Sequence, residues 1–154
     1  MRGFWLFVHI LGFVAWLGGG LAVMLSGITA KSFPPEPRLA IYRVMSVVSR
    51  NLIGPGAVLV VVSGLVLSVP YFRSATVPTW LMAMQTFGLL GAIVAVGIVM
   101  PTAARLGRLD LDPRGELPEG FAGLRRRQAI FATLAGVLAL LALLSGTVFR
   151  VVPP

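Results

Sequence analysis

Four long stretches with almost no charge constrain this chain more than any other feature. A helix needs about 20 mostly apolar residues to cross the hydrocarbon core of a bilayer, and each stretch reaches that length. Because lipid offers no hydrogen-bond partners to a backbone, such segments cross as helices. The sequence therefore predicts an all-α integral membrane four-helix bundle, a single transmembrane domain over residues 1–154. The four spans are residues 4–28, 47–69, 80–104 and 130–149.

The composition excludes most soluble classes of protein and several kinds of site. The chain is 57% hydrophobic and 12% charged, whereas soluble domains carry about 25% charged residues. It has no cysteine and one histidine. This excludes disulfides, thiolate metal sites, haem attached through cysteine, and a multi-histidine metal site within one chain. The first apolar stretch also exceeds the roughly 7–15 residues of a signal-peptide core, which favours a retained helix.

The basic residues predict how the bundle lies in the membrane. Ten of the thirteen Lys and Arg residues fall in or beside the first and third connections. The positive-inside rule places these connections, including a hydrophilic loop over residues 105–128, in the cytoplasm. Both termini then face outward, which for a bacterial inner (plasma) membrane means the periplasm. The run Arg125–Arg127 has no interleaved aromatic residues, so we expect it to contact anionic lipid headgroups and predict no nucleic-acid binding.

Proline and glycine residues precede and interrupt the second span. Pro34–Pro37 predicts a stiff turn, because proline fixes φ and removes a donor. The segment Leu39–Asn51 is amphipathic at helical spacing, which predicts a start in the membrane interface. Pro55, between Gly54 and Gly56, predicts a kink in the helix of this span. Two interpretations of the kink stay open, a hinge beside a cavity or a bend that serves packing.

His9 is the residue best suited to chemistry, because an ionisable side chain inside a membrane helix suggests a function. Imidazole can bind haem iron or another metal, or relay protons. Gly12 and Trp16 follow at i+3 and i+7, on the same helical face. Gly12 leaves room for a flat macrocycle, and Trp16 would flank it. The same face is equally consistent with close helix packing and a structural histidine.

Other residues at the depth of His9 would complete a haem site. Met84 and Met82, at the start of the third span, are candidates for the opposite axial position, since a thioether is a known partner of histidine. Arg73 and Arg150 lie at the same end of the bundle, and they would pair with haem propionates. With one histidine per chain, ligation by two histidines requires a second chain.

The first span also resembles a known family. The segment Phe7–Gly19 resembles the "LH-x-x-G-x-x-x-W-x-G-G" opening of small bacterial membrane proteins related to copper-resistance D-type domains, and it is similar to that of HemJ-type protoporphyrinogen oxidases. The stretches 50–64 and 80–101 resemble the second and third helices of these proteins. In HemJ-type proteins a first-helix histidine is thought to bind haem, which His9 matches. Their functional third-helix lysine would fall near Gln85, and this departure weighs against the same oxidation.

These observations predict a small membrane protein that binds b-type haem through His9, in electron transfer or haem handling. No catalytic residue is predicted. One alternative is a non-enzymatic accessory or structural subunit of a larger membrane complex, or a homodimer, in which His9 only packs. Another is a small metal permease with His9 as a metal ligand. The lipid bilayer is a partner under every alternative.

Overall fold

The computed structural model describes residues 1–73 and 76–151, without the side chains of residues 150 and 151. Throughout these residues the regular structure is helical, which confirms the predicted all-α bundle. The elements in chain order are α1 (Arg2–Thr29), η1 (Ala30–Ser32), α2 (Pro35–Val48), η2 (Ser49–Ile53), α3 (Gly54–Phe72), α4 (Thr79–Val94), η3 (Ala95–Val99), α5 (Met100–Leu106) and α6 (Phe121–Val151).

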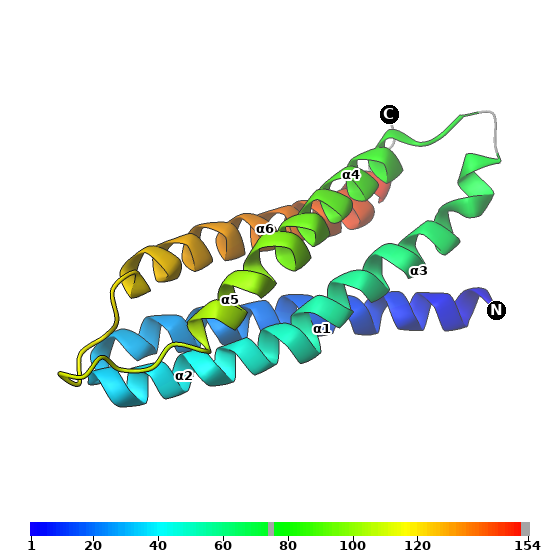
Figure 1. Cartoon of the computed structure of the whole chain (residues 1–154). Coiled ribbons are helices and arrows are strands. Elements are labelled where there is room, and N and C mark those ends of the chain that lie inside the picture. Colours follow the sequence, from blue (N-terminus) through cyan, green and yellow to red (C-terminus); the bar gives the residue numbers. More distant parts are fainter. Residues whose placement is uncertain (74–75, 152–154) are drawn as a thin grey trace.

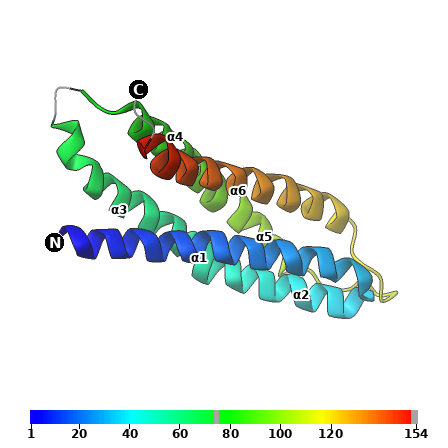
Figure 2. The same ribbon diagram turned by 180° about the vertical axis from the view of Figure 1, so that it is seen from behind.

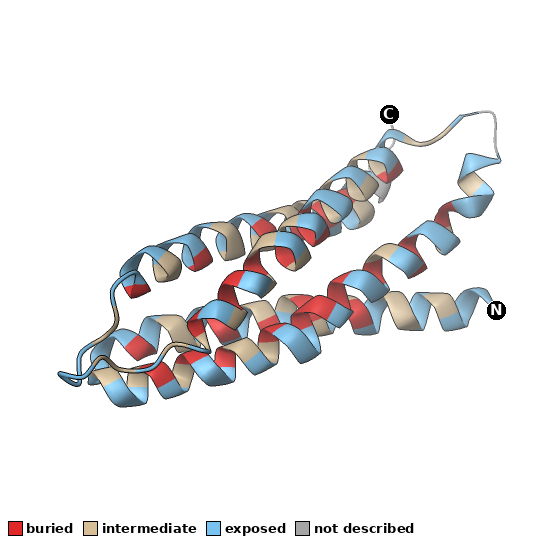
Figure 3. Cartoon of the chain, viewed as in Figure 1, coloured by how far each residue is buried: buried red, intermediate tan, exposed pale blue. Residues whose placement is uncertain are grey.

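Consecutive elements join into four rods, each long and apolar enough to cross a membrane. The rods cover residues 2–32, 35–72, 79–106 and 121–149. Buried residues line the faces that the rods turn toward one another, and exposed residues cover the outside (Figure 3). Large apolar side chains such as Phe7, Leu25 and Ile93 are more than half exposed on that outside. Such a surface suits contact with a lipid bilayer.

The rods are longer than the predicted spans. The second rod begins at Pro35, a residue type favoured in the first helical turn, rather than after a separate proline turn. The fourth begins at Phe121, so the loop predicted over 105–128 is confined to residues 107–120. Gly120, with φ of +84°, marks the break. Phe121 stacks edge-on against Tyr42 at 5.2 Å between ring centroids, which anchors the first turn of α6.

The four rods lie together at the end that holds the 107–120 loop, hereafter the loop end. They spread apart toward the end that holds both termini, hereafter the terminal end (Figures 1 and 2). At the loop end Arg38 donates to the carbonyls of Ala30 and Lys31, in the last turn of the first rod, and of Phe33 just after it. This capping satisfies carbonyl groups that the helix itself leaves unpaired.

The second rod contains a π turn just before Pro55, beside a close crossing with α1. The π turn η2 ends at Ile53, and the N–H of the next residue, Gly54, donates to the carbonyl of Ser49 directly before Pro55. A Cβ on Gly56 would lie 2.8 Å from the carbonyl oxygen of Gly12 on α1. A Cβ on Gly12 would lie 2.9 Å from the carbonyl oxygen of Gly56. The backbones of α1 and α3 therefore cross in direct contact, as small residues permit.

A single added methyl group tests this crossing. We expect Gly12→Ala to lower the stability of the bundle by about 1–3 kcal/mol relative to Gly18→Ala, because overpacking has costs of that order. Gly18 is the matched control, since a Cβ there meets no atom within 4 Å, and both substitutions gain the same helix propensity. Unfolding by SDS titration in mild detergent, followed by circular dichroism, measures the difference. Equal stability of the two variants would contradict the crossing.

Candidate functional site

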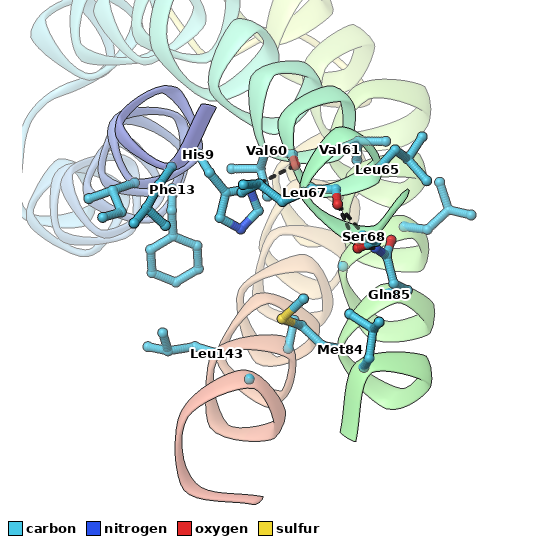
Figure 4. A pocket seen from close by; sticks show the side chains of 18 of the residues that line it. His9, Phe13, Val60, Val61, Leu65, Leu67, Ser68, Met84, Gln85 and Leu143 are labelled. Carbon is cyan, nitrogen blue, oxygen red and sulfur yellow. Dashed lines mark hydrogen bonds between the residues drawn. The ribbon is translucent and has the colours of Figure 1, made fainter. Parts of the chain in front are cut away.

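A cavity of about 840 Å³ opens between the spread helices of the terminal half. Its walls come from α1, α3, α4 and α6 and are mostly apolar (Figure 4). Ligand pockets in proteins commonly hold about 300–1,000 Å³ and combine apolar walls with a few placed polar groups. The polar lining side chains are Arg2, His9, Ser68, Tyr71, Trp80, Gln85 and Thr147. The cavity is therefore of a size and character to hold a largely apolar small molecule.

The structure places the imidazole of His9 in this cavity with one nitrogen engaged. Nδ1 lies 3.0 Å from the carbonyl oxygen of Val60 and 3.0 Å from Oγ of Ser63. A carbonyl oxygen only accepts, so Nδ1 carries the proton and donates it. Within the described part of the chain Nε2 has no hydrogen-bond partner, and the ring projects into the cavity (Figure 4). Nε2 is left with a free lone pair.

The missing side chain of Gly64 makes room for this ring. A Cβ on Gly64 would lie 3.1 Å from Cε1 of His9, closer than most real Cβ contacts. The hydroxyl of Ser63 meanwhile donates to the carbonyl of Leu59 within α3, so its oxygen can accept from Nδ1. One turn of α3 thus supplies both the space and the acceptors that orient His9. Sequence reasoning had singled out neither Val60 nor the contact with Ser63, since both depend on how α1 and α3 face each other.

Gln85 joins α4 to the same turn of α3. Its Nε2 donates to Oγ of Ser68 at 2.5 Å and to the carbonyl oxygen of Gly64 at 3.3 Å. Ser68 in turn donates to the carbonyl oxygen of Gly64 at 2.7 Å. Because that carbonyl only accepts, the amide nitrogen of Gln85 must face α3. Its oxygen, without a partner among the described residues, remains available beside the cavity.

Trp16 and Met84 line the cavity, as the haem hypothesis requires. Trp16 is 4% exposed, and its ring edge lies 3.1 Å from the position that a Cβ on Gly91 would take. It is the lining residue of α1 farthest from the terminal end, so it closes the deep end. The sulfur of Met84 lies only 2.5 Å from the Cβ position of Gly146. That sulfur is therefore packed into α6.

Other predicted residues lie away from the cavity. Met82 is 59% exposed on the outside of α4. Gly12 faces the backbone of α3, so the space beside it is filled by packing and offers no room for a macrocycle. Arg73 is exposed at the end of α3 and does not line the cavity. The side chain of Arg150 lies outside the described residues.

Arg2 is a cavity residue that sequence reasoning missed. It begins α1, seven residues before His9, and lines the cavity together with Tyr71 and Trp80. These two rings meet edge-on at 5.8 Å between centroids and close α3 against α4 at the terminal end. The i, i+7 spacing of Arg2 and His9 was a signal in the sequence. Arg2 is exposed at the start of α1, so it lies at the mouth of the cavity, on the terminal side of His9.

The donor set bears on what the cavity can hold. No group of three or more His, Cys, Asp or Glu side chains suited to a metal ion occurs within the described ranges. A single imidazole instead suits a cofactor that brings its own equatorial ligands. No family model, curated protein or solved structure matches this chain. The resemblance to the copper-resistance D-type and HemJ-type proteins therefore stays a prediction.

The tautomer of His9 can be tested directly, because the chain has one histidine and gives one set of imidazole signals. In ligand-free protein we expect the neutral ring to be protonated at Nδ1 and not at Nε2, because Nδ1 faces the carbonyl of Val60. Nitrogen-15 NMR of histidine-labelled protein in detergent at alkaline pH distinguishes the two forms. A ring protonated at Nε2 would mean that the imidazole is oriented differently.

Proposed function

We propose that this chain is a small membrane protein that binds b-type haem and acts in electron transfer or haem handling. The haem would bind in the cavity of the terminal half, hereafter the terminal cavity. The observation that carries the proposal is the arrangement of His9. Its Nδ1–H is bound to a backbone carbonyl, and its Nε2 lone pair faces an apolar cavity. Histidines that bind metals commonly donate their other ring N–H to a carbonyl or carboxylate, which fixes the ring and raises its basicity. Haem iron commonly takes such a histidine as its proximal ligand.

The cavity fits a haem on three further counts. Its walls are apolar, as a macrocycle requires, and small residues such as Gly88 and Ala142 line it. A Cβ on Gly88 would lie in ordinary van der Waals contact, 3.9 Å from Cβ of Ala142, so two small residues form this wall. Arg2 stands at the mouth, where it would pair with propionates. It takes the role that the sequence suggested for Arg73, which does not line the cavity.

Each lining group has a distinct task in this proposal. Val60 and Ser63 hold the imidazole of His9 so that Nε2 would be free to bind the iron. Trp16 closes the deep end and excludes water from that side. Met84 is a weaker candidate ligand, because its sulfur would have to leave its packed position against Gly146. When bound, haem supplies one-electron redox chemistry.

The alternatives fit these observations less well. A purely structural role for His9, as in an accessory subunit, does not explain the unpaired Nε2 or the cavity that it faces. A metal permease would need further donors along a path, and no donor cluster is found in the described residues. We propose the bacterial inner membrane as the location, with the arginine-rich loop end in the cytoplasm. The mouth of the cavity then faces the periplasm, and a homodimer or larger complex remains compatible with the exposed helices.

Absorption spectroscopy tests the proposal. We expect protein purified in mild detergent from haem-replete cells to show a Soret band and about one haem per chain in a pyridine haemochrome assay. His9→Ala should lose the band while the helical circular dichroism persists, and Met82→Leu, on the exposed side of α4, should retain it. A ratio near one half would indicate one haem shared by two His9 residues in a dimer. A colourless, folded wild-type protein would refute haem binding.

Arg2 and Arg73 form a matched pair for testing the mouth of the cavity. We expect Arg2→Gln to weaken the binding of haem b by about 1 kcal/mol, roughly fivefold, as for a solvent-exposed ion pair. Arg73→Gln should leave the affinity unchanged, since Arg73 does not line the cavity. Titration of the apoprotein with haem b and with its dimethyl ester measures both effects. Equal weakening for the ester would show that Arg2 does not recognise the carboxylates.

A further inference from the structure

Among the residues that the structure describes, two buried polar side chains in the loop half of the bundle have no hydrogen-bond partner. They are Ser49, which is 1% exposed, and Gln128, which is 4% exposed. The hydroxyl oxygen of Ser49 and both polar atoms of the Gln128 amide are unpaired. Leaving such groups unpaired costs about 1–3 kcal/mol each. Native proteins rarely retain several of these at one level, and each calls for an explanation.

The helix register places the two residues at one level of the core. The second and fourth rods both start at the loop end, where Tyr42 stacks against Phe121. Ser49 and Gln128 each follow seven residues later, two turns along the same helical faces. Tyr42, Ser49, Phe121 and Gln128 are all buried. Both side chains therefore face the centre of the bundle at the same depth.

A third buried polar residue belongs to this level. Thr102 on α5, which packs against both α2 and α6, is 3% exposed. The contacts of Ser46 with Gly107 and of Gly54 with Met100 bracket the level on both sides. The hydroxyl of Thr102 donates to the carbonyl of Ile98 at 2.7 Å, so its oxygen can still accept. We refer to Ser49, Thr102 and Gln128 as the polar core layer.

We propose that the polar core layer binds a water molecule that bridges Ser49 and Gln128, with Thr102 as a third partner. Buried waters typically make about three hydrogen bonds to polar groups that otherwise lack partners, and this layer offers both donors and acceptors. Arg50 and Arg127 adjoin the two residues and are exposed on the outside of the bundle. Arginine side chains extend toward headgroups and water, so the layer lies at a depth where water is close to the outside of the bundle.

The bridging water joins the second rod to the fourth in the centre of the loop half. The described structure shows no other polar link between these rods at this level. The site is separate from the terminal cavity, because none of the three residues lines that cavity. The bound water therefore does not depend on haem binding. It holds the helices together at the loop end, while the terminal end stays open.

Hydroxyl-radical footprinting by X-ray radiolysis, on the full chain in detergent, detects water bound inside a protein. Met45 is the reporter, since it is buried one turn before Ser49 and methionine is readily oxidised. We expect Met45 to be modified in the wild type despite its burial. The modification should fall several-fold in Ser49→Ala and in Gln128→Leu. Ser145→Ala is the control, because Ser145 is equally buried but bonds within its own helix.

SDS titration of the same variants supplies a second, independent measurement. We expect each single variant to unfold at a lower SDS midpoint, and the double variant to unfold no earlier than the less stable single one. Non-additive stability without modification of Met45 would indicate a direct side-chain bond and overturn the bound water. Additive or raised midpoints without modification would overturn the link altogether. Modification that persists in Ser49→Ala would place the water elsewhere, and the wild-type footprint decides the question even where a variant fails to fold.

Discussion

The contact between the backbones of α1 and α3 at Gly12 and Gly56 determines most of what the terminal half can do. The two helices run in opposite directions, so residues before Gly12 lie beside residues after Gly56. His9, one turn before Gly12, therefore meets Val60 and Ser63, about one and two turns after Gly56. A wider crossing would separate the imidazole from its carbonyl acceptor. The close approach that these two glycines permit therefore sets the orientation of the His9 imidazole.

The polar side chains that α3 and α4 bring to the middle of the cavity use their donors within the protein. The hydroxyls of Ser63 and Ser68 donate to carbonyls of α3, and the amide nitrogen of Gln85 donates to the same turn. Farther from the mouth than Arg2, two acceptors face the cavity without a partner among the described residues, the imidazole Nε2 of His9 and the amide oxygen of Gln85. In an apolar cavity an unused acceptor is costly unless a ligand engages it. This accounting favours an occupied site over a purely structural histidine.

The sequence predicted the helices and singled out His9, because length, apolarity and an ionisable residue in a span are local signals. Which residues face one another was less accessible. In a helix that is apolar all round, spacing does not distinguish a lipid-facing side from a packed one. Met82 and Met84 differ by two residues, yet Met82 faces outward and Met84 lines the cavity. Gly12 was consistent with two roles, and only the position of Gly56 separates them. Arg2 shares a helical face with His9, but its place at the mouth of the cavity depends on the tilt of α1 relative to the other helices.

The two ends of the bundle differ in how tightly they are closed, and this difference gives the cavity a direction. At the loop end Arg38 caps the first rod, and Tyr42 stacks on Phe121. Arg43 also forms an ion pair with Asp110 of the 107–120 loop. Trp16 then reaches from α1 to Gly91 on α4 and seals the cavity from that half. At the terminal end the helices spread, and α3 meets α4 through the rings of Tyr71 and Trp80. A ligand must therefore enter from the terminal end or from the lipid beside it. An amphiphilic ligand would then lie with its apolar body toward His9. Its acidic edge would face outward, beside Arg2.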